Sequence, residues 1–117
     1  MIFSIETSTS NLSLTLLSNN QVINKVSVKI KNKLSEIIIP TIKKFMKNNS
    51  ITFKCISFLV VGCGPGSFTS IRAVISAAKG IYISNKHIKI LGINSLAGLA
   101  MSALEEAKKR KIKYILA

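Results

Sequence analysis

GCGPGSFTSIR, residues 62–72, lies between two apolar segments and decides which fold this sequence can adopt. The run CISFLVVG at 55–62 is continuous and apolar, as is typical of a strand buried on both faces, and we expect it to be the central strand of a sheet. The apolar residues that follow have helical spacing over 67–84. Glycine permits backbone angles that other residues avoid, and Ser67 suits the position before a helix. A strand, a glycine-rich turn and a helix are therefore predicted in this order.

Shorter elements flank this unit on both sides. Partly alternating apolar residues predict three strands of an antiparallel meander at 2–7, 12–18 and 21–30. The pair Asn19–Asn20 is a signal for the tight turn between the second and third strands. An amphipathic helix is predicted at 34–47, and Pro40 should kink its first turns because proline removes one backbone hydrogen bond. The remaining predicted elements are a strand at 88–93, a helix at 95–110 and a final strand at 113–117.

The order of these elements predicts an α/β fold with a mixed five-stranded sheet, in which the antiparallel meander is followed by parallel strands flanked by helices. This strand order resembles one lobe of the actin-like, ribonuclease-H-like ATPases, which have two such lobes with nucleotide between them. Residues 1–117 are predicted to form a single amino-terminal lobe of this type. We expect the second lobe to be absent, with the strand at 113–117 as its start.

The composition fits one globular domain. Hydrophobic residues make up 48% of the 117 positions, which is enough for a real core. The apolar runs are far shorter than the ~20 residues that cross a bilayer, and the first residues lack the basic segment of a signal peptide. We therefore expect a cytoplasmic protein that does not contact membranes. Cys55 and Cys63 are expected to be buried free thiols, because both lie on one predicted strand and its exit.

The charge is strongly unbalanced, with 17 Lys plus Arg against 4 Asp plus Glu and a formal net charge of +13. Such a field attracts polyanions, nucleic acid above all. However, 15 of these cations are lysines in a chain rich in Ile and Asn, a mixture that compositional bias in coding also produces. The basic clusters have no interleaved aromatic residues on which bases could stack. Electrostatic assistance therefore fits this chain better than recognition of a base sequence.

The glycine-rich turn has two interpretations. The helix that follows Ser67 has no acidic residue in its first turn, so its free amides and its dipole could accept an anion, with Arg72 one turn inside. The turn is not a P-loop, since Ser67 and Phe68 stand where Lys and Ser or Thr are required, and it lacks the third glycine of a dinucleotide fingerprint. These short motifs alone favour a structural turn over an anion site.

Longer motifs are more specific. Four of them, GPGSFTSIRAVISAAKGI (64–81), IETSTSNLSLTLL (5–17), LSEIIIPTI (34–42) and ILGINSLAGLA (90–100), closely resemble the TsaB family. The resemblance covers essentially the whole chain in the correct order and spacing, but only the amino-terminal lobe of that family. It implies an inactive-looking partner subunit of the bacterial threonylcarbamoyladenosine-tRNA synthase. The family is also called YeaZ or glycoprotease-like, and nothing in this sequence supports a protease.

Two positions depart from the family pattern. The family has Asp-Thr-Ser where this chain has Glu6, Thr7 and Ser8, and it has Gly where this chain has Ser70. The first of these loops faces phosphate and metal in the catalytic relatives. Together with Gly64, Gly66, Ser67, Thr69 and Arg72, it forms a candidate anion or nucleotide loop. With one lobe missing, tight ATP binding is not expected.

Catalysis is not expected from this chain. The catalytic paralogue TsaD, which resembles this lobe, holds its metal with two histidines on a helix. This sequence has one histidine, His87, in a predicted turn, and it has no aspartate. The glutamates lie on a strand and two separate helices, so they cannot converge on a metal: Glu6, Glu36, Glu105 and Glu106. We therefore predict no catalytic residue, no metal site and no cofactor.

The helix at 67–84 has a face made of small residues. At about 100° per residue, the side chains expected to pack on the sheet are Ile71, Val74, Ile75, Ala78 and Tyr82. The opposite face would carry Ala73, Ser76, Ala77, Gly80 and Ser84, with Ile39 and Met46 of the helix at 34–47 beside it. A typical exposed face would carry Lys and Glu, whereas small residues let another helix come close. This face is therefore predicted to be a partner interface.

The resemblance implies a TsaD-like catalytic subunit as partner, in a heterodimer through the helices at 34–47 and 67–84, with tRNA bound through the complex. A TsaE-like ATPase and a second copy of the chain are further candidate partners. The complex would modify the adenosine next to the anticodon. Two other functions stay open: a basic nucleic-acid-binding module of ribonuclease-H shape, and one lobe of an assembled sugar-kinase-like enzyme. Ribonuclease-H catalysis itself is excluded, because that chemistry needs several clustered carboxylates.

Overall fold

The computed structural model describes residues 1–111, and its centre is a five-stranded sheet with the strand order β3-β2-β1-β4-β5. The strands are β1 (Ile2–Glu6), β2 (Asn11–Ser18), β3 (Gln21–Lys29), β4 (Phe58–Gly62) and β5 (Lys89–Ile93). The helices are α1 (Leu34–Asn48), η1 (Phe53–Cys55), α2 (Phe68–Ser84), α3 (Ser95–Ser102) and α4 (Leu104–Lys109). The first three strands pair antiparallel, whereas β1, β4 and β5 run parallel. The predicted α/β fold with a mixed sheet is confirmed, and the strand predicted at 113–117 lies outside the described residues.

The tight turn predicted between β2 and β3 is confirmed. Asn19 and Asn20 have φ values of 51° and 61°, both in the left-handed region that asparagine tolerates better than most residues. Two successive residues of this kind form the turn whose twist matches that of a two-stranded ribbon. The turn brings Ser18 opposite Gln21 and sets the register of the hairpin.

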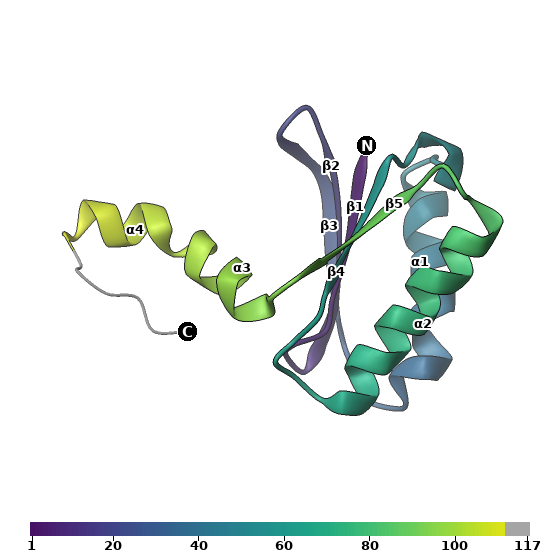
Figure 1. Cartoon of the computed structure of the whole chain (residues 1–117), viewed down its shortest axis with the longest axis horizontal. Coiled ribbons are helices and arrows are strands. Elements are labelled where there is room, and N and C mark those ends of the chain that lie inside the picture. The colour runs from purple at the N-terminus through teal and green to yellow at the C-terminus, as the bar shows by residue number, and fades with distance from the viewer. Residues whose placement is uncertain (112–117) are drawn as a thin grey trace.

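One face of the sheet carries the core. Alternate residues of β1 and β2 point to this face and are buried, namely Phe3, Ile5, Leu12, Leu14 and Leu16. Helices α1 and α2 lie side by side on it, as Figure 1 shows. The ring of Phe45 in α1 stacks on that of Phe3, with centroids 5.8 Å apart. Helix α1 continues through the exposed Pro40 as far as Asn48, so the proline does not end it.

The prediction for the apolar run at 55–62 is partly wrong. The central strand is β1, and β4 lies between β1 and β5. In β4, Leu59 and Val61 are buried under the helices, whereas Phe58 and Val60 on the other face are partly exposed. The helix layer formed by α1 and α2 covers only one face, which is why β4 is not buried on both sides.

The cysteines are free but not buried, contrary to expectation. The apolar run begins in η1 rather than in the strand, so Cys55 ends a short surface helix. Cys63 follows the last residue of β4 and is also exposed. Apolar neighbours in sequence did not place either thiol in the core.

The helix predicted at 95–110 is divided into α3 and α4, with Ala103 between them. Asn94 caps α3, because its side-chain Oδ1 accepts hydrogen bonds from the amides of Leu96 and Ala97. Figure 1 shows α3 and α4 leading away from the sheet at the end of β5. In the described part of the chain, no helix combines the length and the apolar character needed to span a membrane.

Candidate functional site

Three loops meet where the parallel strands β1, β4 and β5 end. Carboxyl ends of parallel strands lie at the same end of a sheet, where α/β folds commonly bind ligands. The amide of Cys63 donates to the carbonyl of Ile93 at 2.8 Å, and the amide of Ser95 donates to the carbonyl of Gly64 at 2.8 Å. We call residues 6–8, 62–66 and 94–95 the loop cluster.

The carboxylate of Glu6 is the centre of this cluster. One of its oxygens, Oε1, accepts hydrogen bonds from the amides of Thr7 at 2.7 Å and Ser8 at 2.6 Å. The other, Oε2, accepts from the hydroxyl of Ser95 at 2.9 Å. Ser95 is the first residue of α3 and only 4% exposed. One carboxylate therefore ties together segments that are 89 positions apart in sequence.

The glycines of the turn are required by close packing. A Cβ at Gly62 would overlap the Glu6 carboxylate. Gly64 has a φ of +95°, and a Cβ there would lie 2.7 Å from Cδ1 of Ile71. A Cβ at Gly66 would lie 3.3 Å from Cα of Ser8. The geometry thus gives the glycine-rich turn a structural role, which is the interpretation that the short motifs favour.

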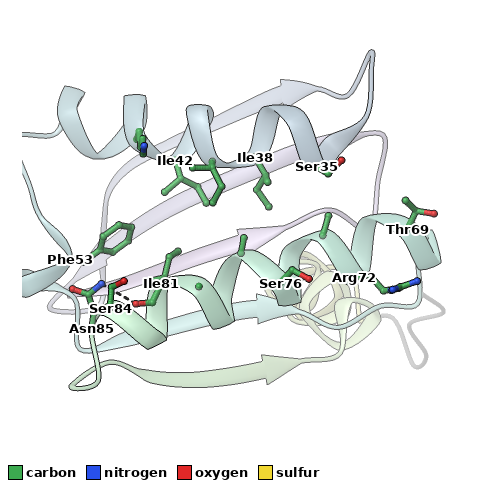
Figure 2. A pocket seen from close by; sticks show the side chains of 15 residues that line it. Ser35, Ile38, Ile42, Phe53, Thr69, Arg72, Ser76, Ile81, Ser84 and Asn85 are labelled. Atoms are coloured by element: carbon green, nitrogen blue, oxygen red, sulfur yellow. Dashed lines mark hydrogen bonds between the residues drawn. The ribbon is translucent and has the colours of Figure 1, made fainter.

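The candidate anion loop is divided by the structure. Glu6, Thr7, Ser8, Gly64 and Gly66 belong to the loop cluster. Ser67 caps α2, and its Oγ accepts a hydrogen bond from the amide of Ser70 at 3.4 Å. The other two residues, Thr69 and Arg72, line a groove between α1 and α2 (Figure 2). The Arg72 guanidinium lies over the ring of Phe68, 5.3 Å from its centroid.

Metal-ligating groups are dispersed over the described residues. Within that part of the chain, no group of three or more His, Cys, Asp or Glu side chains is placed to hold a metal ion. His87 is exposed, and its Nε2 lies 3.1 Å from the carbonyl oxygen of Phe53. Glu36 is exposed on α1, away from the loop cluster in sequence and element. The charged oxygen of the loop cluster is that of Glu6.

The groove between α1 and α2 has a volume of about 760 Å³ and is mainly apolar. From α1, Ile38 and Ile42 point toward α2 (Figure 2), and Ile39, which is 39% exposed, lies beside them. The α2 wall consists of small residues, namely Ala73, Ser76, Ala77, Gly80 and Ser84. Gly80 faces open space, because a Cβ there would meet nothing within 4 Å. Two helices thus present an open groove with apolar walls.

The predicted orientation of α2 is partly wrong. Its buried residues are Val74, Ala77, Ala78 and Ile81, whereas Tyr82 is 38% exposed. The helix is rotated toward α1, so Ala77, which is 7% exposed, forms the floor of the groove instead of an outward face. Met46 is 5% exposed and belongs to the core rather than to an exposed patch. Ser76, Gly80 and Ser84 are exposed as predicted.

A family model described as TsaD, tRNA N6-adenosine threonylcarbamoyltransferase, matches residues 22–114. The chain belongs to this family. It is 36% identical over 112 residues to the tRNA threonylcarbamoyladenosine biosynthesis protein TsaB of Buchnera aphidicola subsp. Schizaphis graminum, with 96% of this chain and 52% of the relative covered. The protein of the same name from Buchnera aphidicola subsp. Acyrthosiphon pisum is 33% identical, with 96% and 50% covered. The chain therefore spans about half the length of these curated relatives.

Solved structures agree on the fold. YeaZ from Pseudomonas aeruginosa superposes with a TM-score of 0.78 at 22% identity, covering 92% of this chain and 49% of that one. A second structure, of an uncharacterized protein with similarity to peptidase YeaZ from Pseudomonas aeruginosa, gives a TM-score of 0.80 at 22% identity with the same coverage. The resemblance to the TsaB family that the four motifs indicate is confirmed.

Sequence reasoning on this member of the TsaD family missed two features of the loop cluster. Ser95 was predicted only as a helix start, and its bond to Glu6 joins distant segments, so no local pattern could reveal it. The contact of Gly62 with the Glu6 carboxylate was equally invisible. A small residue at the end of a buried strand is a weak signal that another group lies close to the backbone.

Proposed function

We propose that the chain is a non-catalytic subunit in tRNA threonylcarbamoyladenosine synthesis, which supports a TsaD-type catalytic subunit in modifying the adenosine next to the anticodon. The TsaB relatives, whose names state a role in the biosynthesis of this nucleoside, support the process. The match to the TsaD family model supports a TsaD-like partner, because related folds often pair through equivalent surfaces. The site of action would be the cytoplasm, where tRNA is modified.

The groove between α1 and α2 is the observation that carries this proposal. Its exposed residues include Ile39, Ser76, Gly80 and Ser84, where an ordinary solvated helix surface would carry Lys and Glu. Small residues on α2 let the backbone of another helix come close, and the isoleucines of α1 supply apolar area to bury. A helical partner surface therefore fits this groove better than solvent does.

The loop cluster supports a non-catalytic role. The Glu6 carboxylate accepts hydrogen bonds from three donors of its own chain, so its lone pairs are engaged inside the protein. A carboxylate that served a metal or a substrate would have to give up these partners. We propose that tRNA and any TsaE-like ATPase are bound through the assembled complex rather than by this cluster.

The net charge of +13 favours a second candidate, a module that binds nucleic acid by itself. This alternative requires tight RNA affinity of the isolated chain, falling steeply as salt rises. Titration of the pure chain with tRNA at two salt concentrations separates the two functions, because a partner subunit needs no such affinity.

The substitution Gly80→Glu tests the proposed function. Since position 80 faces open space, the variant should fold as the wild type does. In a helix-to-helix interface the new carboxylate would be buried without a partner, which costs about 3–5 kcal/mol, or about two to four decades of affinity. The measurement is co-elution and titration with the TsaD-like subunit from the same source.

The matched control is Gly98→Glu in α3, where a Cβ also meets nothing within 4 Å. It adds the same charge to another exposed helix and should leave the affinity near that of the wild type. Wild-type affinity of the folded Gly80→Glu protein would refute the groove as the interface. If the chain alone elutes as a dimer that Gly80→Glu disrupts, the groove binds a second copy instead.

A further inference from the structure

The Glu6 carboxylate is held as a bound anion is held. It lies against two successive backbone amides, those of Thr7 and Ser8, at 2.7 and 2.6 Å, and against the hydroxyl of Ser95 at 2.9 Å. Successive amides that point to one place form an anion-binding concavity in many proteins. The third donor comes from a different segment and is itself 4% exposed, so the donors do not depend on one flexible loop.

The surroundings are shaped around this anion. A Cβ at Gly62 would occupy the place of the carboxylate, so the end of β4 leaves room for it. Thr7 is only 2% exposed, and within residues 1–111 its Oγ1 has no hydrogen-bond partner. Buried hydroxyls normally have a partner, and an unpaired one beside an anion position indicates capacity for a further acceptor. A phosphate offers more acceptor oxygens than a carboxylate does.

We propose that the loop cluster is an anion-binding site whose ligand is the chain's own Glu6 carboxylate, and that inorganic phosphate takes this place when the carboxylate is removed. The two groups are similar in size once the side chain beyond Cβ is gone, and both are pure acceptors for the same donors. The net charge of +13 raises the local concentration of small anions. In the wild type, Glu6 therefore keeps the site closed to phosphate groups, nucleotide phosphates included.

Thermal melting of Glu6→Ala in phosphate, with chloride at equal ionic strength as reference, tests this inference. Without phosphate, the variant should melt below the wild type, because three donors lose their acceptor. Inorganic phosphate should raise its melting temperature by about 5 °C at about ten times the dissociation constant. The wild type and the matched control Glu36→Ala, which removes an exposed carboxylate of α1, should not respond.

The double variant Glu6→Ala, Ser95→Ala locates the bound phosphate. Its phosphate response should be smaller, because one of the three donors is gone; an undiminished response would place the ion on surface lysines and overturn the proposal. The proposal also fails if folded Glu6→Ala shows no phosphate response, or if the wild type responds equally.

If Glu6→Ala does not fold in chloride, refolding in phosphate decides. Recovery in phosphate alone supports the site, and failure in both buffers overturns it. None of these results depends on the groove, so this inference and the proposed function fail separately.

Discussion

The groove between α1 and α2 and the loop cluster at the ends of β1, β4 and β5 differ in what they lack. The groove is open and apolar, and its exposed Ile39, Ser76 and Gly80 have no neighbour to cover them within the described residues. The loop cluster is polar, and its charged group is engaged by three donors of the same chain. One region is complete by itself, whereas the other presents surface that water covers poorly.

This difference teaches where an actin-like lobe can keep a function without chemistry. In α/β folds the carboxyl ends of parallel strands are the usual ligand site. Here that place is filled by a side chain, while the opposite resource of the fold, the outer surface of its helix layer, stays open. Substitutions in the two regions should therefore behave differently, and the predictions below are ordered by the size of the expected effect.

The largest effect is expected from Ala77→Glu, at the floor of the groove. Ala77 is 7% exposed and part of the core, so a carboxylate there loses water without gaining a partner. The free energy of unfolding should fall by about 3–5 kcal/mol. Thermal melting followed by circular dichroism measures this change. Ser76→Glu, one position away on the exposed wall, is the control and should stay within about 0.5 kcal/mol of the wild type.

Equal melting of Ala77→Glu and the wild type would break the comparison at its groove side. It would mean that water reaches the floor, so that the face of α2 toward α1 is solvated in the free protein.

An intermediate effect is expected from Gly62→Ala in the loop cluster. The new Cβ would displace the Glu6 carboxylate, whose flexible side chain can move away but then leaves its donors unpaired. The free energy of unfolding should fall by about 1–3 kcal/mol. A double-mutant cycle gives the decisive measurement: in a Glu6→Ala background the same substitution should cost far less. Additive effects would show that the carboxylate and the glycine do not act together.

The smallest effect is expected from Gly80→Ala, and it has the opposite sign. Position 80 lies inside α2 with no atom within 4 Å of a new Cβ, so alanine should stabilise the protein by about 0.5–1 kcal/mol through helix propensity. Chemical denaturation can resolve this gain. The contrasting variant is Gly64→Ala, which should destabilise because its φ is +95°. A loss of stability in Gly80→Ala would mean that the groove is narrower than described.

Most of the fold could be predicted because its signals are local. Asn19 and Asn20 mark the hairpin by their tolerance of positive φ, and Ser67 marks the start of α2 by its capping oxygen. The strand order could not be predicted in the same way, because it depends on which strands meet after the chain has crossed over. The break at Ala103 also escaped notice, since alanine favours a helix wherever it stands.

The candidate site was only partly predictable. Small residues mark one side of α2, but Ala73, Ser76 and Ala77 are too alike to show which of them faces α1. The large isoleucines of that helix are equally ambiguous, since Ile71 and Ile75 are only partly buried. The partner of Glu6 depended on a contact across 89 positions, for which a single sequence holds no periodic signal.

The outer strands of the described sheet, β3 and β5, bear on how copies of this protein behave in a concentrated solution. Both expose apolar side chains, Ile23 on one and Leu91 on the other, beside backbone groups that could pair with a second sheet. Both also carry lysine, including Lys25 and Lys89, in a chain whose formal net charge is +13. Mutual repulsion acts over about 10 Å at 0.1 M salt but over only about 3 Å at 1 M. Ionic strength is therefore the colloidal control of this protein, which stays dispersed in dilute buffer and salts out by strand-to-strand association.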